Sequence, residues 1–203
     1  MICLAVLVGM LFSAVASSEI VVGVKQGDWI EYEVTVTGDA PEEHNVTWSK
    51  IEIISVEGKK IDIKMMSRYC NGTEVTVTST LNLETGQIGD AFIIPANLDN
   101  GETFKKNGDI ITISGVEERI YAGATRTVVY ATTAKTMFYW DQSTGVVVEA
   151  ISSFPDFTMI TKAEKTNMWQ TQIFGLDPIV FIVLIVLVVV AVSAIFLIYK
   201  MKK

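Results

Sequence analysis

Hydrophobic and polar residues alternate in several segments of the chain between residues 29 and 81. In residues 29–36, Ile30, Tyr32, Val34 and Val36 fall on one side of the alternation. The pattern recurs in residues 51–56, 61–65 and 74–81, and further strands are predicted around residues 109–114, 125–131, 136–140, 146–152 and 157–163. A period of two is typical of half-buried strands. The pattern predicts an all-β domain built as an antiparallel meander, a curved sheet or half-barrel, or a sandwich.

Turn sequences separate the predicted strands. Glu57-Gly58-Lys59 predicts a tight hairpin, and Asn71-Gly72 is a strong two-residue turn signal. Further turns are predicted at residues 100–101, 107–108 and 141–145. Between the two ends of the chain, only residues 163–172 suggest a short helix or a stalk.

An apolar run without any charge occupies residues 178–199. A helix of this length covers about 33 Å, enough for a bilayer core of about 30 Å. Asp177 is a suitable N-cap, and Pro178 suits the first helical turn. Lys200, Lys202 and Lys203 follow the run and predict a cytoplasmic C-terminus by the positive-inside rule. The sequence therefore predicts a single-pass protein of the cell membrane, with its preceding domain outside.

The N-terminus carries a second, shorter apolar run, which ends in Ala14-Val15-Ala16. This pattern predicts a secretory signal peptide over residues 1–16. No lysine or arginine precedes the run, so an uncleaved signal anchor is the alternative. The predicted order is a signal peptide (1–16), an extracytoplasmic β domain (17–168), a juxtamembrane stalk (169–177), a transmembrane helix (178–199) and a cytoplasmic tail (200–203).

Charge and cysteine content narrow the functional classes. All 23 acidic residues and 13 of the 16 basic residues lie between residues 19 and 177, which gives this region a net charge of −10. An acidic domain repels nucleic acid, so a nucleic-acid partner is not expected. Cys3 lies in the predicted signal, which leaves Cys70 without an intramolecular disulfide partner.

The sequence offers little catalytic chemistry. His44 is the only histidine and falls in a loop-like stretch, where a solvated side chain is expected. No G-x-S-x-G motif, phosphate-binding glycine loop or zinc ligand set is present. The oxygen-rich segments 99–102 and 107–109 depart from the calcium-loop pattern and are typical of hairpin turns. We therefore expect no enzyme activity, no cofactor and no metal.

Two N-x-T sequons make Asn45 and Asn71 candidate glycosylation sites. Each precedes a predicted strand and falls in a loop or turn on the predicted outer side. Glycans there would coat two loop tips.

Three segments carry a resemblance to a known group of proteins. They are Gly27-Asp28-Trp29-Ile30-Glu31-Tyr32-Glu33-Val34, Phe92-Ile93-Ile94-Pro95-Ala96-Asn97-Leu98, and Tyr139-Trp140-Asp141 continued by Thr144-Gly145 to Ala150. With the single C-terminal span, the chain resembles a group of uncharacterised archaeal single-pass surface proteins. The last segment is also similar to a hairpin in the half-barrel of lipoprotein carriers of the LolA and LppX type. That similarity implies a concave sheet able to hold an acyl chain, although those carriers close it with helices that this sequence does not predict.

Two functional hypotheses follow. The first is a membrane-anchored surface protein whose β domain has a non-catalytic binding or structural role. The alternative is a membrane-tethered carrier or binder of lipid or another hydrophobic ligand. An apolar pocket lined by Phe92, Tyr130, Phe138 and Trp140 would favour the second. The expected partners are the membrane, through one C-terminal helix, and a lipid or another surface protein.

Overall fold

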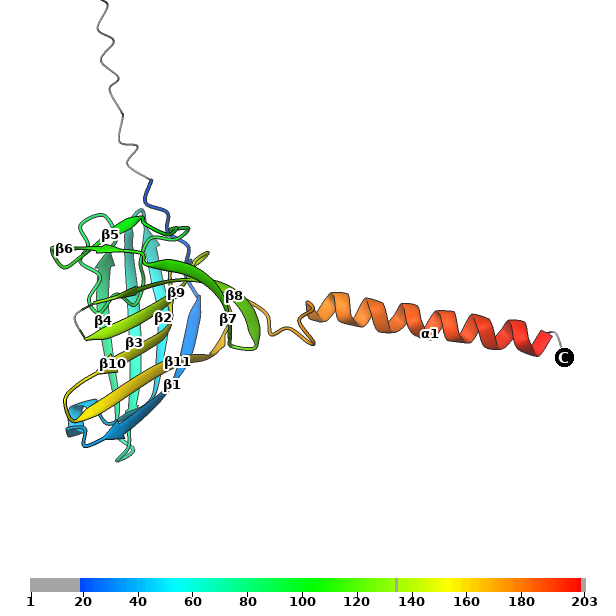
Figure 1. Cartoon of the computed structure of the whole chain (residues 1–203), viewed down its shortest axis with the longest axis horizontal. Helices are drawn as coiled ribbons and strands as arrows, with labels where there is room; N and C mark the ends of the chain where they lie inside the picture. Colours follow the sequence, from blue (N-terminus) through cyan, green and yellow to red (C-terminus); the bar gives the residue numbers. More distant parts are fainter. Residues whose placement is uncertain (1–18, 134, 202–203) are drawn as a thin grey trace, which may run out of the picture.

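The computed structural model describes residues 19–133 and 135–201, and these residues form one β domain followed by one helix (Figure 1). The strands are β1 Trp29–Gly38, β2 Val46–Glu57, β3 Lys60–Tyr69, β4 Glu74–Asn82, β5 Thr103–Lys106, β6 Asp109–Thr112, β7 Gly115–Tyr121, β8 Ala124–Thr132, β9 Thr136–Asp141, β10 Val147–Ser153 and β11 Phe157–Thr166. A single 3-10 turn, η1 (Glu42–His44), precedes β2, and the C-terminal helix is α1 (Pro178–Met201). The predicted all-β fold class with one C-terminal helix is confirmed.

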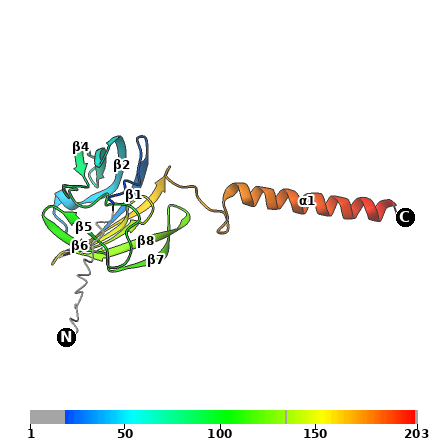
Figure 2. The ribbon, with the colours of Figure 1, turned by 90° about the horizontal axis from the view of Figure 1, so that it is seen from above.

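Nine strands form one antiparallel sheet in the order β4-β3-β2-β1-β11-β10-β9-β8-β7, and β5 and β6 form a separate hairpin. The first strand pairs with the last, because β1 lies between β2 and β11. The pairing register shifts at Glu31/Tyr32, at Ile53/Ser55 and at Val147/Glu149. Such bulges bend a sheet and increase its twist. Figure 2 shows the resulting curvature, with β7 and β8 turned away from β2 and β4.

Residues 83–100 and the β5–β6 hairpin cover part of the concave face, which we define as the sheet face that carries Tyr32, Ile51 and Phe138. The covering segment buries large apolar side chains: Leu83, Ile88, Ile93, Ile94 and Leu98. Because burying an apolar side chain is favourable by about 1.5–3 kcal/mol, this segment is part of the core. Within the described residues, the concave face is therefore covered by irregular chain and a hairpin rather than by helices.

The predicted strands all coincide with observed strands, whereas β5 and β7 were not predicted. In β7, Glu117, Arg119 and Tyr121 point to the same side, where Arg119 pairs with Glu149 of β10. Because polar side chains occupy this face, β7 lacks the apolar–polar alternation that predicts a strand. The short-helix interpretation of residues 163–172 is wrong, because β11 continues to Thr166, opposite Ile30 of β1.

Helix α1 is capped as predicted, since the Asp177 Oδ1 accepts a hydrogen bond from the Ile179 amide at 2.8 Å. The helix is long and apolar enough to cross a membrane, and none of its most apolar stretch is buried in the domain. Lys200 lies in its last turn. Lys202, Lys203 and the predicted signal peptide lie outside the described residues.

The segment between β11 and α1 is docked on the β7–β8 hairpin. The Gln172 amide donates to the Gly123 carbonyl at 2.8 Å, and the Gln172 Oε1 accepts from the Thr125 amide at 3.0 Å. The Trp169 indole donates to the Tyr121 carbonyl at 3.2 Å. Trp169 therefore packs on the domain, while Phe174 is exposed. The hairpin tip is thus held near the start of α1.

We expect Gly123→Ala to undock this segment. Gly123 has a φ of +75°, and a Cβ there would overlap the Thr171 side chain. Left-handed backbone costs a non-glycine residue about 1–2 kcal/mol, and the overlap adds to that cost. Limited proteolysis of the purified protein should cut residues 167–177 faster in this variant. Gly58→Ala is the matched control, because its φ is +60° and its Cβ would meet nothing within 4 Å. Equal cleavage rates in the two variants would contradict the docking.

Candidate functional site

A cavity of about 370 Å³ opens on the concave face of the sheet. We call it the sheet cavity. Side chains from β1, β2, β3, β9, β10 and β11 form its walls, and Phe92 and Lys106 close it from the covering segment and from β5. Its large apolar lining residues include Tyr32, Val34, Ile51, Met65, Phe138 and Met159. The volume falls within the range of about 300–1,000 Å³ that small-molecule sites occupy.

The register of the sheet explains why space remains there. Tyr32 stands opposite Ser49, and Ser49 stands opposite Ser67. Phe138 stands opposite Ala150, which stands opposite Thr161. Because cross-strand partners share a face, small side chains lie beside large ones on the cavity wall. Ser49, Ser67, Ala150 and Thr161 are too short to fill the space between the larger residues.

Most hydroxyl groups of the sheet cavity are paired within the wall. The buried Tyr32 hydroxyl donates to the Val147 carbonyl at 2.8 Å, and burial raises the pKa of Tyr32 far above its ordinary value. The Ser49 hydroxyl donates to the Met66 carbonyl at 3.0 Å, and the Thr136 and Ser152 hydroxyls are 2.9 Å apart. A hydroxyl that donates within the wall has no hydrogen left for a ligand, although its oxygen can still accept. These hydroxyls therefore offer a ligand few hydrogen-bond donors.

Aromatic and charged side chains complete the lining. Phe154 and Phe157 stack with their ring centroids 4.3 Å apart, and the His44 ring lies 5.4 Å and 5.3 Å from them. His44 is thus half-buried beside the sheet cavity, and the prediction of a solvated loop histidine is wrong. Asp90 and Lys106 supply the two charges of the lining.

Phe92 and Phe138 are two of the four predicted ligand residues, and the structure brings both to the sheet cavity. Trp140 is completely buried beneath it, with its ring stacked on Phe138 at 5.1 Å. Tyr130 pairs with Tyr139, and its ring lies 5.7 Å from the Tyr139 ring. Since Tyr139 is one position from Phe138 along β9, both tyrosines belong to the opposite face of the sheet.

Sequence reasoning missed Tyr32, Met65, Lys106, Met159 and Thr161 as cavity residues. Tyr32 was placed correctly on the apolar side of its strand, but alternation does not show which apolar residues line a space. Lys106 precedes the Asn107-Gly108 turn, and the sequence around it indicates only a hairpin. Only the pairing register, which joins distant segments, identifies these positions.

A polar cluster on the opposite face fastens β7 to β10. The Arg119 guanidinium contacts the Glu149 carboxylate at 3.1 Å and the Glu117 carboxylate at 2.6 Å. The Tyr121 hydroxyl donates to Glu149 at 2.6 Å. Burial, and then the Glu149 carboxylate, raise the pKa of Tyr121, so its hydroxyl stays protonated as a donor. Every member has a partner in the cluster, and we assign the cluster a structural role.

The two sequons lie around one surface hollow of about 430 Å³, which Glu42, Asn45, Cys70 and Asn71 line. The Asn71 Nδ2 donates to the Glu42 carboxylate at 3.0 Å, and the Cys70 thiol donates to the Asn45 Oδ1 at 2.8 Å. Asn71 and Cys70 are exposed, as a loop tip requires. Glycosylation at Asn45 and Asn71 stays a prediction.

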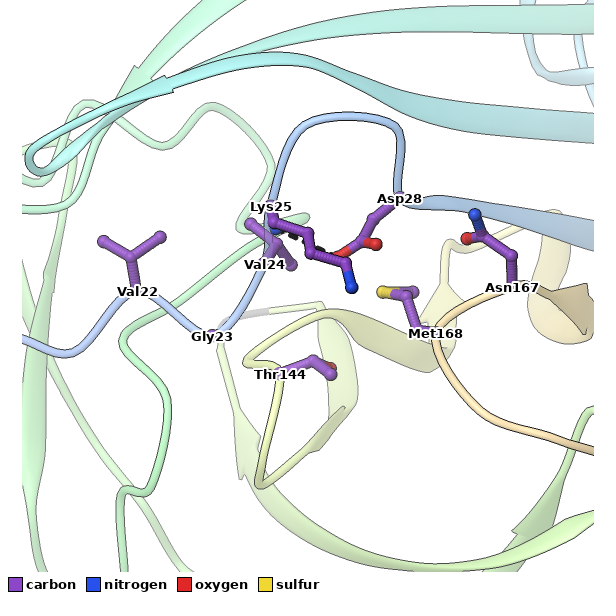
Figure 3. Close-up of a pocket in the computed structure, with 8 residues that line it drawn as sticks. All are labelled: Val22, Gly23, Val24, Lys25, Asp28, Thr144, Asn167 and Met168. Carbon is purple, nitrogen blue, oxygen red and sulfur yellow. Dashed lines mark hydrogen bonds between the residues drawn. The ribbon is translucent and has the colours of Figure 1, made fainter.

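A smaller hollow of about 250 Å³ lies between the N-terminal segment and the chain after β11, and Figure 3 shows its lining. Several of its polar groups are already engaged. The Lys25 backbone amide donates to the Asp28 carboxylate at 2.9 Å. The Asn167 Oδ1 accepts from the Trp29 amide at 2.8 Å, and the Asn167 Nδ2 donates to the Gly27 carbonyl at 2.9 Å. The hollow therefore holds the two segments together and is a weaker candidate than the sheet cavity.

Metal chemistry has no site in the part of the chain that the structure describes. No three His, Cys, Asp or Glu residues within residues 19–133 and 135–201 gather closely enough to hold an ion. In the oxygen-rich segment 99–102, the Glu102 carboxylate accepts a hydrogen bond from the Asp99 amide at 2.7 Å, as in an ordinary turn.

Comparison with known proteins assigns no family. No family model matches the chain, and no curated protein matches it. One similar solved structure is described as "The Siderocalin Ex-FABP functions through dual ligand specificities", with a TM-score of 0.28 and 10% identity over 72% of this chain and 76% of that one. At this TM-score the likeness does not bear on the ligand of this chain. The resemblances to archaeal surface proteins and to LolA and LppX carriers stay predictions.

Proposed function

We propose that this protein binds a hydrophobic or amphiphilic ligand in its sheet cavity while α1 tethers the domain to a membrane. The observation that carries the proposal is the sheet cavity itself, an apolar space of about 370 Å³. A sheet packed solid would instead have favoured a purely structural role. No catalytic step is part of the proposal.

The chemistry of the cavity wall supports this choice of ligand. Removing apolar surface from water contributes about 25 cal/mol for each Å². The wall offers Ile51, Met65 and Phe138 for this contact, and methionine adapts its shape to irregular partners. Because most wall hydroxyls already donate within the wall, a ligand with many hydrogen-bond acceptors would find few donors there.

The location is part of the same proposal. The apolar helix α1 supplies the tether, and its basic end would face the cytoplasm, with the β domain outside. The short segment between Gln172 and Asp177 would hold the domain near the bilayer, where hydrophobic ligands are concentrated. The span would act only as a tether, because it contains no ionisable residue between Pro178 and Tyr199.

A second candidate function is a structural surface module, and the exposure of β4 favours it. Val75 and Val77 of this edge strand are 40% and 48% exposed, and β4 pairs with β3 without any register shift. A regular, exposed edge is a template for pairing with another chain. This role would leave the sheet cavity without a ligand.

Thr161→Phe tests the proposal by filling the sheet cavity. We expect a photoactivatable alkyl probe, added to the full-length protein in nanodiscs, to label cavity peptides in the wild type. Labelling of these peptides should fall at least about tenfold in the variant, because a bulky side chain in an occupied space forces the ligand out. Labelling of α1 by probe dissolved in the bilayer should not change.

Thr158→Phe is the matched control. Thr158 lies on the same strand as Thr161 but an odd number of residues away, so its side chain points to the opposite face. This variant should be labelled like the wild type. Equal labelling of cavity peptides in both variants, or labelling confined to α1, would favour the structural module.

A further inference from the structure

Lys106 is a half-buried cation in the wall of the sheet cavity. Its Nζ lies 5.2 Å from the centroid of the Phe138 ring. Within the described part of the chain, no ion pair or hydrogen bond engages its ammonium group. The neighbouring Lys105 is exposed, and its Cβ lies against Gly86 instead.

An unpaired ammonium group in an apolar wall is unfavourable, because burial weakens its hydration. The aromatic face of Phe138 offsets part of this loss through a cation–π contact. An anion would offset it more completely, since hydrogen bonds between charged partners are about twice as strong as neutral ones.

We propose that the ligand of the sheet cavity is an amphiphile with an anionic head group, a carboxylate or a phosphate, that pairs with the Lys106 ammonium. This inference rests on the proposed function and specifies its ligand. The apolar chain of the ligand lies against Ile51, Met65 and Phe138, and the head group stays at Lys106.

The surroundings of Lys106 leave room for a hydrated head group. Lys106 and Thr136 also border an adjoining surface hollow of about 410 Å³, which Lys135 lines as well. Lys106 therefore stands where the apolar cavity meets water. Lys135 is exposed, and its Nζ lies 5.7 Å from the Phe154 ring centroid, which adds a second positive charge near this opening.

Two carboxylates lie near the same opening. Asp90 lines the sheet cavity, and Asp109 lines the adjoining hollow. Both are exposed, and neither forms an ion pair with Lys106. Water and salt screen exposed charges much more than half-buried ones. The half-buried Lys106 therefore sets the preferred charge of the head group. A preference for a cationic amphiphile would be the opposite result.

The test measures competition in full-length protein in nanodiscs. A photoactivatable derivative of decanol labels the cavity peptides, and decanoate, decyl phosphate, decanol and decylammonium compete for the site. In the wild type, decanoate or decyl phosphate should reach half-competition at a concentration about tenfold or more below that of decanol. Preference for one of the two anions would separate a free fatty acid from a phosphate-bearing lipid, and either supports the inference.

Lys106→Met should abolish the anion preference, so that the anions and decanol reach half-competition at similar concentrations. Each competitor partitions into the nanodisc to the same extent for every protein variant. Partitioning therefore cancels when the variants are compared by the ratio of half-competition concentrations for anion and decanol. Lys105→Met should keep the wild-type preference, and Lys106→Arg should restore it. If decanol competes as well as the anions in the wild type, if decylammonium competes best, or if Lys106→Met keeps the preference, the inference is overturned. If no cavity peptide is labelled at all, the proposed function fails as well.

Discussion

Replacing Trp140 with alanine is expected to lower the free energy of unfolding by about 3–5 kcal/mol. Trp140 is completely buried, with its ring 5.5 Å from Phe104 and 5.1 Å from Phe138. The substitution also leaves the Ala91 carbonyl without its donor, because the Trp140 indole donates to it at 2.7 Å. Domains have about 5–15 kcal/mol of stability, so this loss is a large fraction of the total.

All four tryptophans lie between residues 29 and 169. Tryptophan fluorescence of the full-length protein in nanodiscs therefore reports on unfolding of the β domain, by urea or by heat. The melting temperature of Trp140→Ala should fall by roughly 6–20 °C. Trp29→Ala is the control, because Trp29 is only half-buried at the start of β1, with the Lys50 Nζ 4.7 Å from its ring centroid. A Trp140→Ala variant that melts like the wild type but no longer binds the alkyl probe would place this ring in contact with ligand.

Asp141→Asn is expected to lower the free energy of unfolding by about 1.5–3 kcal/mol at neutral pH. The Asp141 carboxylate is fully buried and accepts from the Arg126 guanidinium at 2.7 Å, the Ser143 hydroxyl at 2.7 Å and the Thr144 amide at 2.9 Å. Burial raises the pKa of this carboxyl, but Arg126, Ser143 and Thr144 outweigh burial and hold the pKa below its ordinary value. The asparagine keeps the shape and loses the charge.

The effect of this substitution should depend on pH in a defined direction. A carboxyl whose pKa is lower in the folded state than in the unfolded state stabilises the protein above the unfolded value of about 3.9. That stabilisation disappears as the pH falls through the lower, folded value. The wild type and Asp141→Asn should therefore differ fully at neutral pH and converge in acid. Urea unfolding at a series of pH values measures this.

Asp109→Asn is the control for the charge change, because Asp109 is exposed at the start of β6. It should unfold like the wild type at every pH. A difference between the wild type and Asp141→Asn that stays constant down to acid pH would mean that the buried ion pair does not provide the stabilisation.

The sequence predicted most of the sheet, for reasons that the structure makes clear. Strands such as β1 bury one face only, so Ile30, Tyr32 and Val34 alternate with more exposed residues. The alternation is absent where both faces are engaged or where polar groups occupy a face that packs against neighbouring strands. In β7 the side chains of Glu117, Arg119 and Tyr121 share the face opposite the sheet cavity, and Arg119 and Tyr121 find partners on β9 and β10. Local sequence does not reveal such partners.

The sheet cavity was only partly predictable. Phe92 and Phe138 were named as candidate ligand residues, but whether they meet a space or a solid core depends on the register. The pairing of Phe138 with Ala150, and of Ala150 with Thr161, leaves the space open. Tyr130, the candidate on β8, lies on the opposite face with Tyr139, because one residue of register separates the two faces of a strand.

The most direct measurement of the central claim is native mass spectrometry of the full-length protein, released from nanodiscs made with its own membrane. We expect the wild type and Thr158→Phe each to carry one bound molecule that has the mass of a lipid and an acidic group. Thr161→Phe should lack this bound molecule. Bare protein in all three samples, or the same bound mass in Thr161→Phe as in the wild type, would contradict the claim that the sheet cavity holds a ligand.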